Sequence, residues 1–448
     1  MKTEQEINTN PLDTQPIGRT FIKYLIPSLV GMLLMALNFV VDGIMVGNRL
    51  GHVALAGVGI AGPVYTIFVA MSLWIGIGGA TLFSQSMGAK NVKRAHLIFT
   101  QSLVLIFSAT LIIGIIAFIF REPLVYALGA NEETYPFASA YLQVMLLFGF
   151  VFTIENACSV FVRNDRGPNL AMAALIVTAV SNVILNYIIL YILNLGVAGA
   201  AAGTIISAAL GILVLSLHFF KKSSQLRLVR LRFDWKLLST AILLGFPSFL
   251  AEVGISVFTI SHNVTLERLA GTDGVAAFSV LNYVHSVMLL MFLGMGSAVQ
   301  PLVSYYHGGK QLSRKLQTIR IALWTATGAG LLFFIIGQAA SRPIVSIFGQ
   351  FETEVIELAT SGIRIFFFAY LFMGINFVMM TYYQSIGNVR MATWITFARE
   401  ILFMLIILFI LPAFIGVTGV WLAIPIAELL VLISILFYIR RYPLISGS

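Results

Sequence analysis

The stretch SQSMGAKNVKR at residues 84–94 recurs as SYYHGGKQLSR at residues 304–314, with its Ser, Gly, Lys and Arg at the same spacing. The offset of 220 residues also relates identical residues throughout the two halves of the chain. The matched pairs are Pro27 and Pro247, Gly51 and Gly271, Ser84 and Ser304, Gly88 and Gly308, Lys90 and Lys310, Arg94 and Arg314, Pro123 and Pro343, Gly129 and Gly349, Asn156 and Asn376, Gly167 and Gly387, Gly196 and Gly416, and Gly199 and Gly419. One constant offset leaves no net insertion between the copies, so the chain is an internal duplication.

The composition is that of a membrane protein. Hydrophobic residues make up 59% of the chain and charged residues 10%, against about 45–50% and about 25% in soluble domains. Twelve apolar runs are long enough to cross a bilayer as helices, and none alternates polar and apolar residues as a membrane β-strand does. They lie near residues 21–47, 53–82, 97–120, 138–162, 170–193, 196–220, 237–265, 275–302, 318–339, 359–384, 391–414 and 417–439. The sequence therefore predicts an all-α polytopic membrane protein with twelve transmembrane helices.

Six crossings in each half return the chain to the side of the membrane where it began. The halves are therefore predicted to be parallel repeats, related by an axis along the membrane normal. We predict a six-helix lobe over residues 1–220, a basic cytoplasmic linker over 221–236 and a second six-helix lobe over 237–448. Duplicated hydrophobic chains of this kind are typical of secondary transporters, whose two halves rock around a shared site.

The formal net charge of +9 is unevenly distributed. Of the 27 Lys and Arg residues, 21 fall at the termini or in the even-numbered turns, whereas the odd-numbered turns hold four of them and eight acidic residues. Positive-inside bias therefore predicts a multi-pass protein of the plasma (cytoplasmic) membrane with both termini in the cytoplasm. Topology and contact with anionic lipid of the bilayer explain the basic excess, so no nucleic-acid partner is predicted.

Motifs for enzymatic chemistry are absent from the sequence. It contains no GxxxxGK[ST] phosphate loop, no HExxH or Cys/His cluster for a metal, no GxSxG nucleophile elbow and no TVGYG potassium filter. The single cysteine, Cys158, excludes an internal disulfide. We therefore predict that the chain is not an enzyme, that it has no cofactor and no metal site, and that ATP does not drive it directly.

Asp42 is the ionisable residue at bilayer depth that most strongly indicates function. Two polar or soft side chains of the first helix precede it by four and seven residues, which places all three on one face. Two amides of the fifth helix, four residues apart, and a hydroxyl of the sixth lie at similar depth. The predicted network comprises Asp42 with Met35, Asn38, Asn182, Asn186 and Thr204. A carboxyl, amides and a hydroxyl that converge in this way can hold an ion or a proton.

The second half has different residues at these positions. Phe258 replaces Asn38, His262 replaces Asp42, Leu402 replaces Asn182 and Ile406 replaces Asn186. Because one lobe is polar where its copy is mostly apolar, the fold does not require these polar groups. The alternative is a carboxyl that local amides satisfy in order to fix helix packing, and we favour the functional interpretation.

A second cluster of ionisable residues lies at bilayer depth in the second half. It comprises Glu252, Arg399, Glu400 and Glu428, and the first-half counterparts of the three Glu residues are apolar. An Arg among Glu residues is more often a buried structural ion network than a transport site, so we interpret it as structural, with transport as the alternative. Glu155, near one end of its helix, is interpreted as a residue that snorkels to the membrane surface or pairs with a neighbour.

The chain contains 16 Met and 35 Phe residues, which suit an adaptable pocket because Met is flexible and aromatic faces attract organic cations. The candidates in the first half are Met35, Met71, Met145, Met172, Phe39 and Phe152. We expect each of them to face lipid or to fill packing.

The first helix resembles that of the multidrug and toxic compound extrusion (MATE) family, and within it the DinF-like branch. The match consists of Pro27, Asp42, Val46-Gly47, Leu50-Gly51 and Leu55-Ala56, and the Asn182-x3-Asn186 pair is similar to the polar pair in the fifth helix of that branch. The resemblance covers nearly the whole chain. It implies a V-shaped pair of lobes that exports cationic or amphipathic small molecules in exchange for H⁺ or Na⁺, with Asp42 as the coupling residue. We expect the protein to be a monomer.

The sequence departs from the NorM-like branch of this family, which has a Glu eight residues after the Pro of the seventh helix and an acid in the tenth. Here the first position is Ile255, with Glu252 three residues earlier, and no acid occurs between Leu358 and Ser385. Both departures favour protons at Asp42, since a carboxyl among apolar groups is more easily protonated than one in water. We therefore predict a proton-coupled drug exporter. The alternatives are Na⁺-coupled drug antiport by the same fold, a lipid-linked oligosaccharide flippase, and a channel or receptor.

Overall fold

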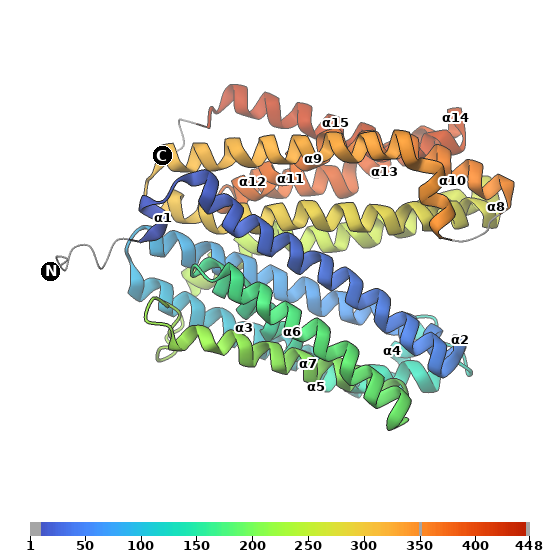
Figure 1. Cartoon of the computed structure of the whole chain (residues 1–448), viewed down its shortest axis with the longest axis horizontal. Helices are drawn as coiled ribbons and strands as arrows, with labels where there is room; N and C mark the ends of the chain where they lie inside the picture. The colour runs from blue at the N-terminus through green and yellow to red at the C-terminus, as the bar shows by residue number, and fades with distance from the viewer. Residues whose placement is uncertain (1–9, 349–351, 445–448) are drawn as a thin grey trace. The chain divides into compact units, whose positions relative to one another are not determined.

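The computed structural model describes residues 10–348 and 352–444, apart from the side chain of Phe39, and in these ranges consists of helices joined by turns and by an irregular linker segment over residues 224–234. The helices are α1 (Pro11–Thr14), α2 (Ile17–Gly88), α3 (Val92–Ile119), α4 (Arg121–Ala127), α5 (Tyr135–Asn164), α6 (Pro168–Tyr187), η1 (Ile188–Ile192), α7 (Gly196–Ser216), η2 (Leu217–Phe220), α8 (Trp235–Gly308), α9 (Leu312–Ile347), α10 (Thr353–Phe366), η3 (Phe367–Ala369), α11 (Tyr370–Ser385), α12 (Val389–Phe397), η4 (Ala398–Leu402), α13 (Phe403–Ile410), α14 (Pro412–Ile415) and α15 (Val417–Arg441) (Figure 1).

Ten continuous helical segments of the described chain are long and apolar enough to cross a membrane. Two of them, α2 and α8, contain 72 and 74 residues, and a straight helix of that length would measure about 110 Å. Each is interrupted by one glycine with non-helical dihedrals, Gly51 at φ 85° and Gly271 at φ 55°. Glycine adopts positive φ without steric cost, so each long helix bends there and supplies two crossings. The prediction of twelve transmembrane helices is confirmed.

The repeated turn has the same backbone in both halves of the chain. α2 ends at Gly88 and α8 ends at Gly308, as their sequences predict. The left-handed residue is the lysine two positions later, Lys90 at φ 59° and Lys310 at φ 56°. In both turns the N–H of the following residue donates to the carbonyl five residues earlier, at 2.8 Å, which closes the helix end. In each unit, we call the end of the helices that carries its turn the basic side.

The chain forms two compact units. The first unit comprises Ile26–Phe249, which takes in α3 to η2, the linker, most of α2 and the beginning of α8; the second unit comprises the remainder of the chain. The divisions fall inside α2, between Leu25 and Ile26, and inside α8, between Phe249 and Leu250. The lobe limits at residues 220 and 237 therefore stay a prediction.

Asp165 holds the linker on the first unit. Its buried carboxylate lies 2.8 Å from the ring nitrogen of His218 and accepts a hydrogen bond from the Ser224 hydroxyl at 3.2 Å. The backbone N–H groups of Gln225 and Leu226 donate to the same carboxylate at 2.6 and 3.2 Å. These contacts explain why the beginning of the linker belongs to the first unit.

Candidate functional site

Asp42 lies on α2 and is partly buried. The side-chain amide of Asn186, on α6, is 1% exposed and donates to Asp42 Oδ1 at 2.8 Å. The carboxyl therefore has one fixed donor from a neighbouring helix.

The fully buried amide of Asn182 also faces this carboxyl. One of its two terminal atoms lies 2.6 Å from Asp42 Oδ1 and 3.2 Å from the amide oxygen of Asn38, and the other lies 3.3 Å from Thr204 Oγ1. Which of the two is nitrogen follows from the hydrogen-bond network. If the nitrogen faces Asp42, it donates to the carboxylate and Thr204 donates to the amide oxygen. If the oxygen faces Asp42, two oxygens 2.6 Å apart require a proton between them, which the carboxyl supplies.

The structure thus brings together Asp42, Asn38, Asn182, Asn186 and Thr204, and the arrangement suits either protonation state of the carboxyl. These contacts depend on side chains from three helices, α2, α6 and α7. The role of the five residues in coupling stays a prediction.

Met35 and Gly203 differ from the sequence-based expectation. Met35 lies on α2 about 10 Å along the helix from Asp42, too far to join the hydrogen-bonded group. Gly203 of α7 is not among the predicted site residues, but a Cβ at this position would be 2.4 Å from Asn186 Oδ1. The small residues of the sixth apolar run are the sequence signal that indicates where the amide side chain of a neighbouring helix fits.

The soft and aromatic side chains of the first lobe mainly fill packing. Met145 and Phe152 are buried in a cluster formed by α5 and α7, and Met71 is also buried. Met172 is partly buried, and the side chain of Phe39 lies outside the described part of the structure.

In the second unit, Arg399 is the centre of an ion network. It pairs with Glu400, its Nε lies 3.5 Å from Glu428 Oε1, and its guanidinium lies 3.8 Å from the ring centre of Phe377. Asn376 donates to the other Glu428 oxygen at 2.7 Å. Arg399 lies on the π-helical turn η4, a single turn between α12 and α13.

Glu252 is not part of this ion network. It is partly buried and makes no ion pair with the described residues. Arg399, Glu400 and Glu428 also line a pocket with an empty volume of about 430 Å³, together with polar, aromatic and apolar side chains of α8, α11 and α15. Three of the four residues predicted for the second cluster therefore form the ion network, and Glu252 lies within electrostatic range of Glu400 without an ion pair.

Glu155 of α5 does not snorkel. Its side chain is 3% exposed, and its carboxylate accepts a hydrogen bond from the Thr178 hydroxyl at 2.6 Å. A Cβ at Gly211 of α7 would lie 2.3 Å from both of these oxygens, so a glycine makes room for them. The tertiary structure turns this residue inward because the facing helix has no side chain there.

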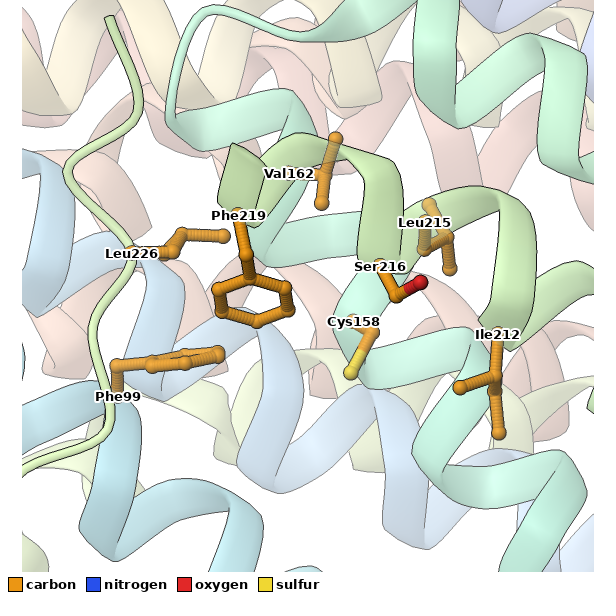
Figure 2. Close-up of a pocket in the computed structure, with 8 residues that line it drawn as sticks. All are labelled: Phe99, Cys158, Val162, Ile212, Leu215, Ser216, Phe219 and Leu226. Carbon is orange, nitrogen blue, oxygen red and sulfur yellow. The ribbon is translucent and has the colours of Figure 1, made fainter. Parts of the chain in front are cut away.

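An apolar pocket lies between α3, α5, α7, η2 and the linker. It has an empty volume of about 280 Å³ and is lined by Phe99, Cys158, Val162, Ile212, Leu215, Ser216, Phe219 and Leu226. Figure 2 shows the rings of Phe99 and Phe219 and the side chain of Leu226 gathered at one part of the pocket, with Cys158 and Ser216 at another. None of the residues that line this pocket is charged.

The duplicated helices and the polar site agree with the comparison with known families. The MatE family matches residues 27–188 and again residues 247–410, which together exceed half of the chain. The chain belongs to the MatE family. The two matched segments of this MATE transporter are the two copies of the internal duplication.

Relatives of this MATE chain are similar over nearly their whole length. The multidrug export protein MepA of Staphylococcus saprophyticus is 24% identical over 423 residues, which cover 92% of this chain and 91% of that protein. The probable multidrug resistance protein YoeA of Bacillus subtilis is 24% identical over 450 residues, which cover 98% and 97%. A solved structure described as the outward-facing conformation of a multidrug resistance MATE family transporter of the MOP superfamily has a TM-score of 0.90 at 21% identity and covers 100% of this chain and 99% of that one. This last likeness is one of fold.

Proposed function

We propose that this MATE transporter exports cationic or amphipathic drugs in exchange for protons, and that Asp42 carries the coupling proton. The observation that carries the proposal is the 2.6 Å contact between the Asn182 amide and Asp42 Oδ1. By a turn of one amide, the same side chains stabilise a charged or a protonated carboxyl. In either orientation the Asn182 amide keeps one hydrogen bond with Asp42 and one with Thr204.

Exchange follows from the charge of Asp42. As a carboxylate, it attracts a cationic drug or stabilises the state that binds one; as an acid, it does neither. Proton and drug binding are then linked, and each changes the affinity of the other by the same factor, typically about 5- to 150-fold. The names of the relatives, a multidrug export protein and a probable multidrug resistance protein, support a drug as the substrate.

The direction of transport follows from the proposed orientation in the membrane. With the basic side in the cytoplasm, as positive-inside bias predicts, protons enter from the opposite side and leave on the basic side. Drug moves the other way, out of the cell.

The test uses purified protein in proteoliposomes with ethidium as the cationic probe. An imposed pH gradient should drive ethidium transport, and an imposed Na⁺ gradient should not. Asp42→Asn keeps the shape of the side chain but cannot bind a proton, so it should abolish the gradient-driven rate per folded molecule. Glu354→Gln, at an exposed acid of α10, is the matched control and should transport like wild type. Transport by Asp42→Asn at the wild-type rate, or by Na⁺ alone, contradicts proton coupling at Asp42.

A further inference from the structure

Glu155 is a buried carboxyl to which the proposed function assigns no part. It accepts one hydrogen bond, from Thr178, and makes no ion pair within the described residues. It lies nine residues before the end of α5, about 13 Å from the basic side. An uncompensated charge at such a place costs several kcal/mol, so the carboxyl needs a proton or a cation.

The elements packed on α5 offer Glu155 no cation at this depth. Neither α6 nor α7 contains a Lys, Arg or His, and the cations of α3 end with His96, near its start on the basic side. The second crossing of α2 has only Tyr65 as a titratable group between residues 53 and 82. On α5 itself, Cys158 lies one turn away, and the buried Arg163 is eight residues away, about 12 Å along the helix. A proton is therefore the counter-charge that the structure leaves for Glu155.

Two rows of small and polar residues lie between this carboxyl and Asp42. The rows, which we call the polar ladder, are Thr178, Asn182 and Asn186 on α6 and Gly211, Ser207 and Gly203 on α7. Each row has a spacing of four residues, which keeps it on one helix face. Gly203 faces Asn186 and Gly211 faces Thr178, as the positions of an added Cβ show. Ser207, 1% exposed, lies midway between the two glycines on the same face.

The polar ladder ends at a carboxyl on each side. Asn186 donates to Asp42 at 2.8 Å at one end, and Thr178 donates to Glu155 at 2.6 Å at the other. The two ends are eight residues apart on α6, or about 12 Å. Asn186 Oδ1 is buried without a hydrogen-bond partner in the described structure, so the ladder still has a vacant acceptor. A contact that served packing alone would avoid the cost of burying these polar groups.

We propose that Glu155 is a second proton-binding carboxyl of the first lobe, and that its protonation is coupled to that of Asp42 through the polar ladder. This inference rests on the proposed function. Each carboxyl takes its proton from water and returns it to water, so an O–H bond of hydronium breaks as an O–H bond forms on the carboxyl, and nothing is oxidised or reduced. Because the ladder residues contact both carboxyls, the charge of one changes the affinity of the other for its proton.

The experiment compares Glu155→Gln, which cannot bind a proton, with Glu155→Asp, which keeps the carboxyl, and with the exposed control Glu354→Gln. Two quantities are measured per folded molecule: ethidium transport under a pH gradient, and protons released when ethidium binds in weakly buffered detergent solution. Glu155→Gln should lose most of the transport that the pH gradient drives and should release fewer protons when ethidium binds. Glu155→Asp should recover much of both. A merely structural Glu155 would change the yield of folded protein and leave both quantities unaltered.

The outcomes separate this inference from the proposed function. If Asp42→Asn loses transport while Glu155→Gln keeps the wild-type rate and proton release, Glu155 is not a second acceptor and coupling at Asp42 stands. If Asp42→Asn keeps transport, the proposed function itself fails. Should Glu155→Gln not fold, Thr178→Val removes the hydrogen bond and leaves the carboxyl in place. It should shift the pH dependence of transport, and an unchanged pH profile refutes the inference.

Discussion

Replacing Arg399 by Met removes the only cation of the ion network in the second unit. Glu428 is 1% exposed and Glu400 has 13% of its side chain exposed, so both carboxylates would lose their partner while remaining largely buried. Breaking a buried pair from one side typically costs about 3–5 kcal/mol. Arg399→Met should therefore destabilise the protein by an amount in this range.

Two contacts decide where in the range the value falls. Arg399 lies 3.8 Å from the centre of the Phe377 ring, and a desolvated cation–π contact contributes up to about 2 kcal/mol. Asn376 continues to donate to Glu428 in the variant, which reduces the cost of the stranded charge. The first contact raises the expected loss and the second lowers it, so we expect a value near the middle, about 4 kcal/mol.

The assay is thermal unfolding in detergent, followed by size-exclusion chromatography with fluorescence detection. The double variant Arg399→Met with Glu428→Gln removes one stranded charge and should recover about 0.5–3 kcal/mol, the usual coupling between residues in contact. Arg390→Met, at an exposed arginine, is the control and should melt like wild type. A variant Arg399→Met that melts normally but loses ethidium transport per folded molecule would show that the cluster is a transport site, and the structural interpretation would be wrong.

Two further predictions concern helix packing and topology. Gly245→Ala should lower the free energy of unfolding by about 1–3 kcal/mol, because the new Cβ would lie 1.6 Å from a backbone carbonyl oxygen of α2. The measurement is the melting temperature, and the control is Gly328→Ala, which has open space around it. Equal melting of the two variants would refute the close approach. Leu228→Cys and Leu312→Cys, each in a Cys158→Ala background, place an exposed thiol on the basic side; an impermeant reagent should label them only after the cells are opened, and labelling of intact cells would reverse the proposed orientation.

Much of this architecture can be read from the chain because it depends on local properties. Apolar runs of bilayer length must form helices, since lipid offers no partner for the backbone. The repeat of Gly51 at Gly271 marks the two bends that turn two long helices into four crossings. Asp42 is predicted to be functional from its depth and from the different residue at its repeat position. Four-residue spacing also places Asn182 and Asn186 on one face before any neighbour is known.

The tertiary structure alone decides what those faces meet. The 2.6 Å contact at Asp42 requires that α6 approach α2 with one particular rotation, which periodicity within either helix does not contain. Glu155 is turned inward because Gly211, 56 residues later in the chain, leaves a space where a side chain would otherwise lie. Glu252 is the same residue type as Glu400 and Glu428 and lies at a similar depth, yet it makes no ion pair in their network. In each case the partner comes from another helix, so sequence determined the depth and the helix face, and packing between helices determined the contact.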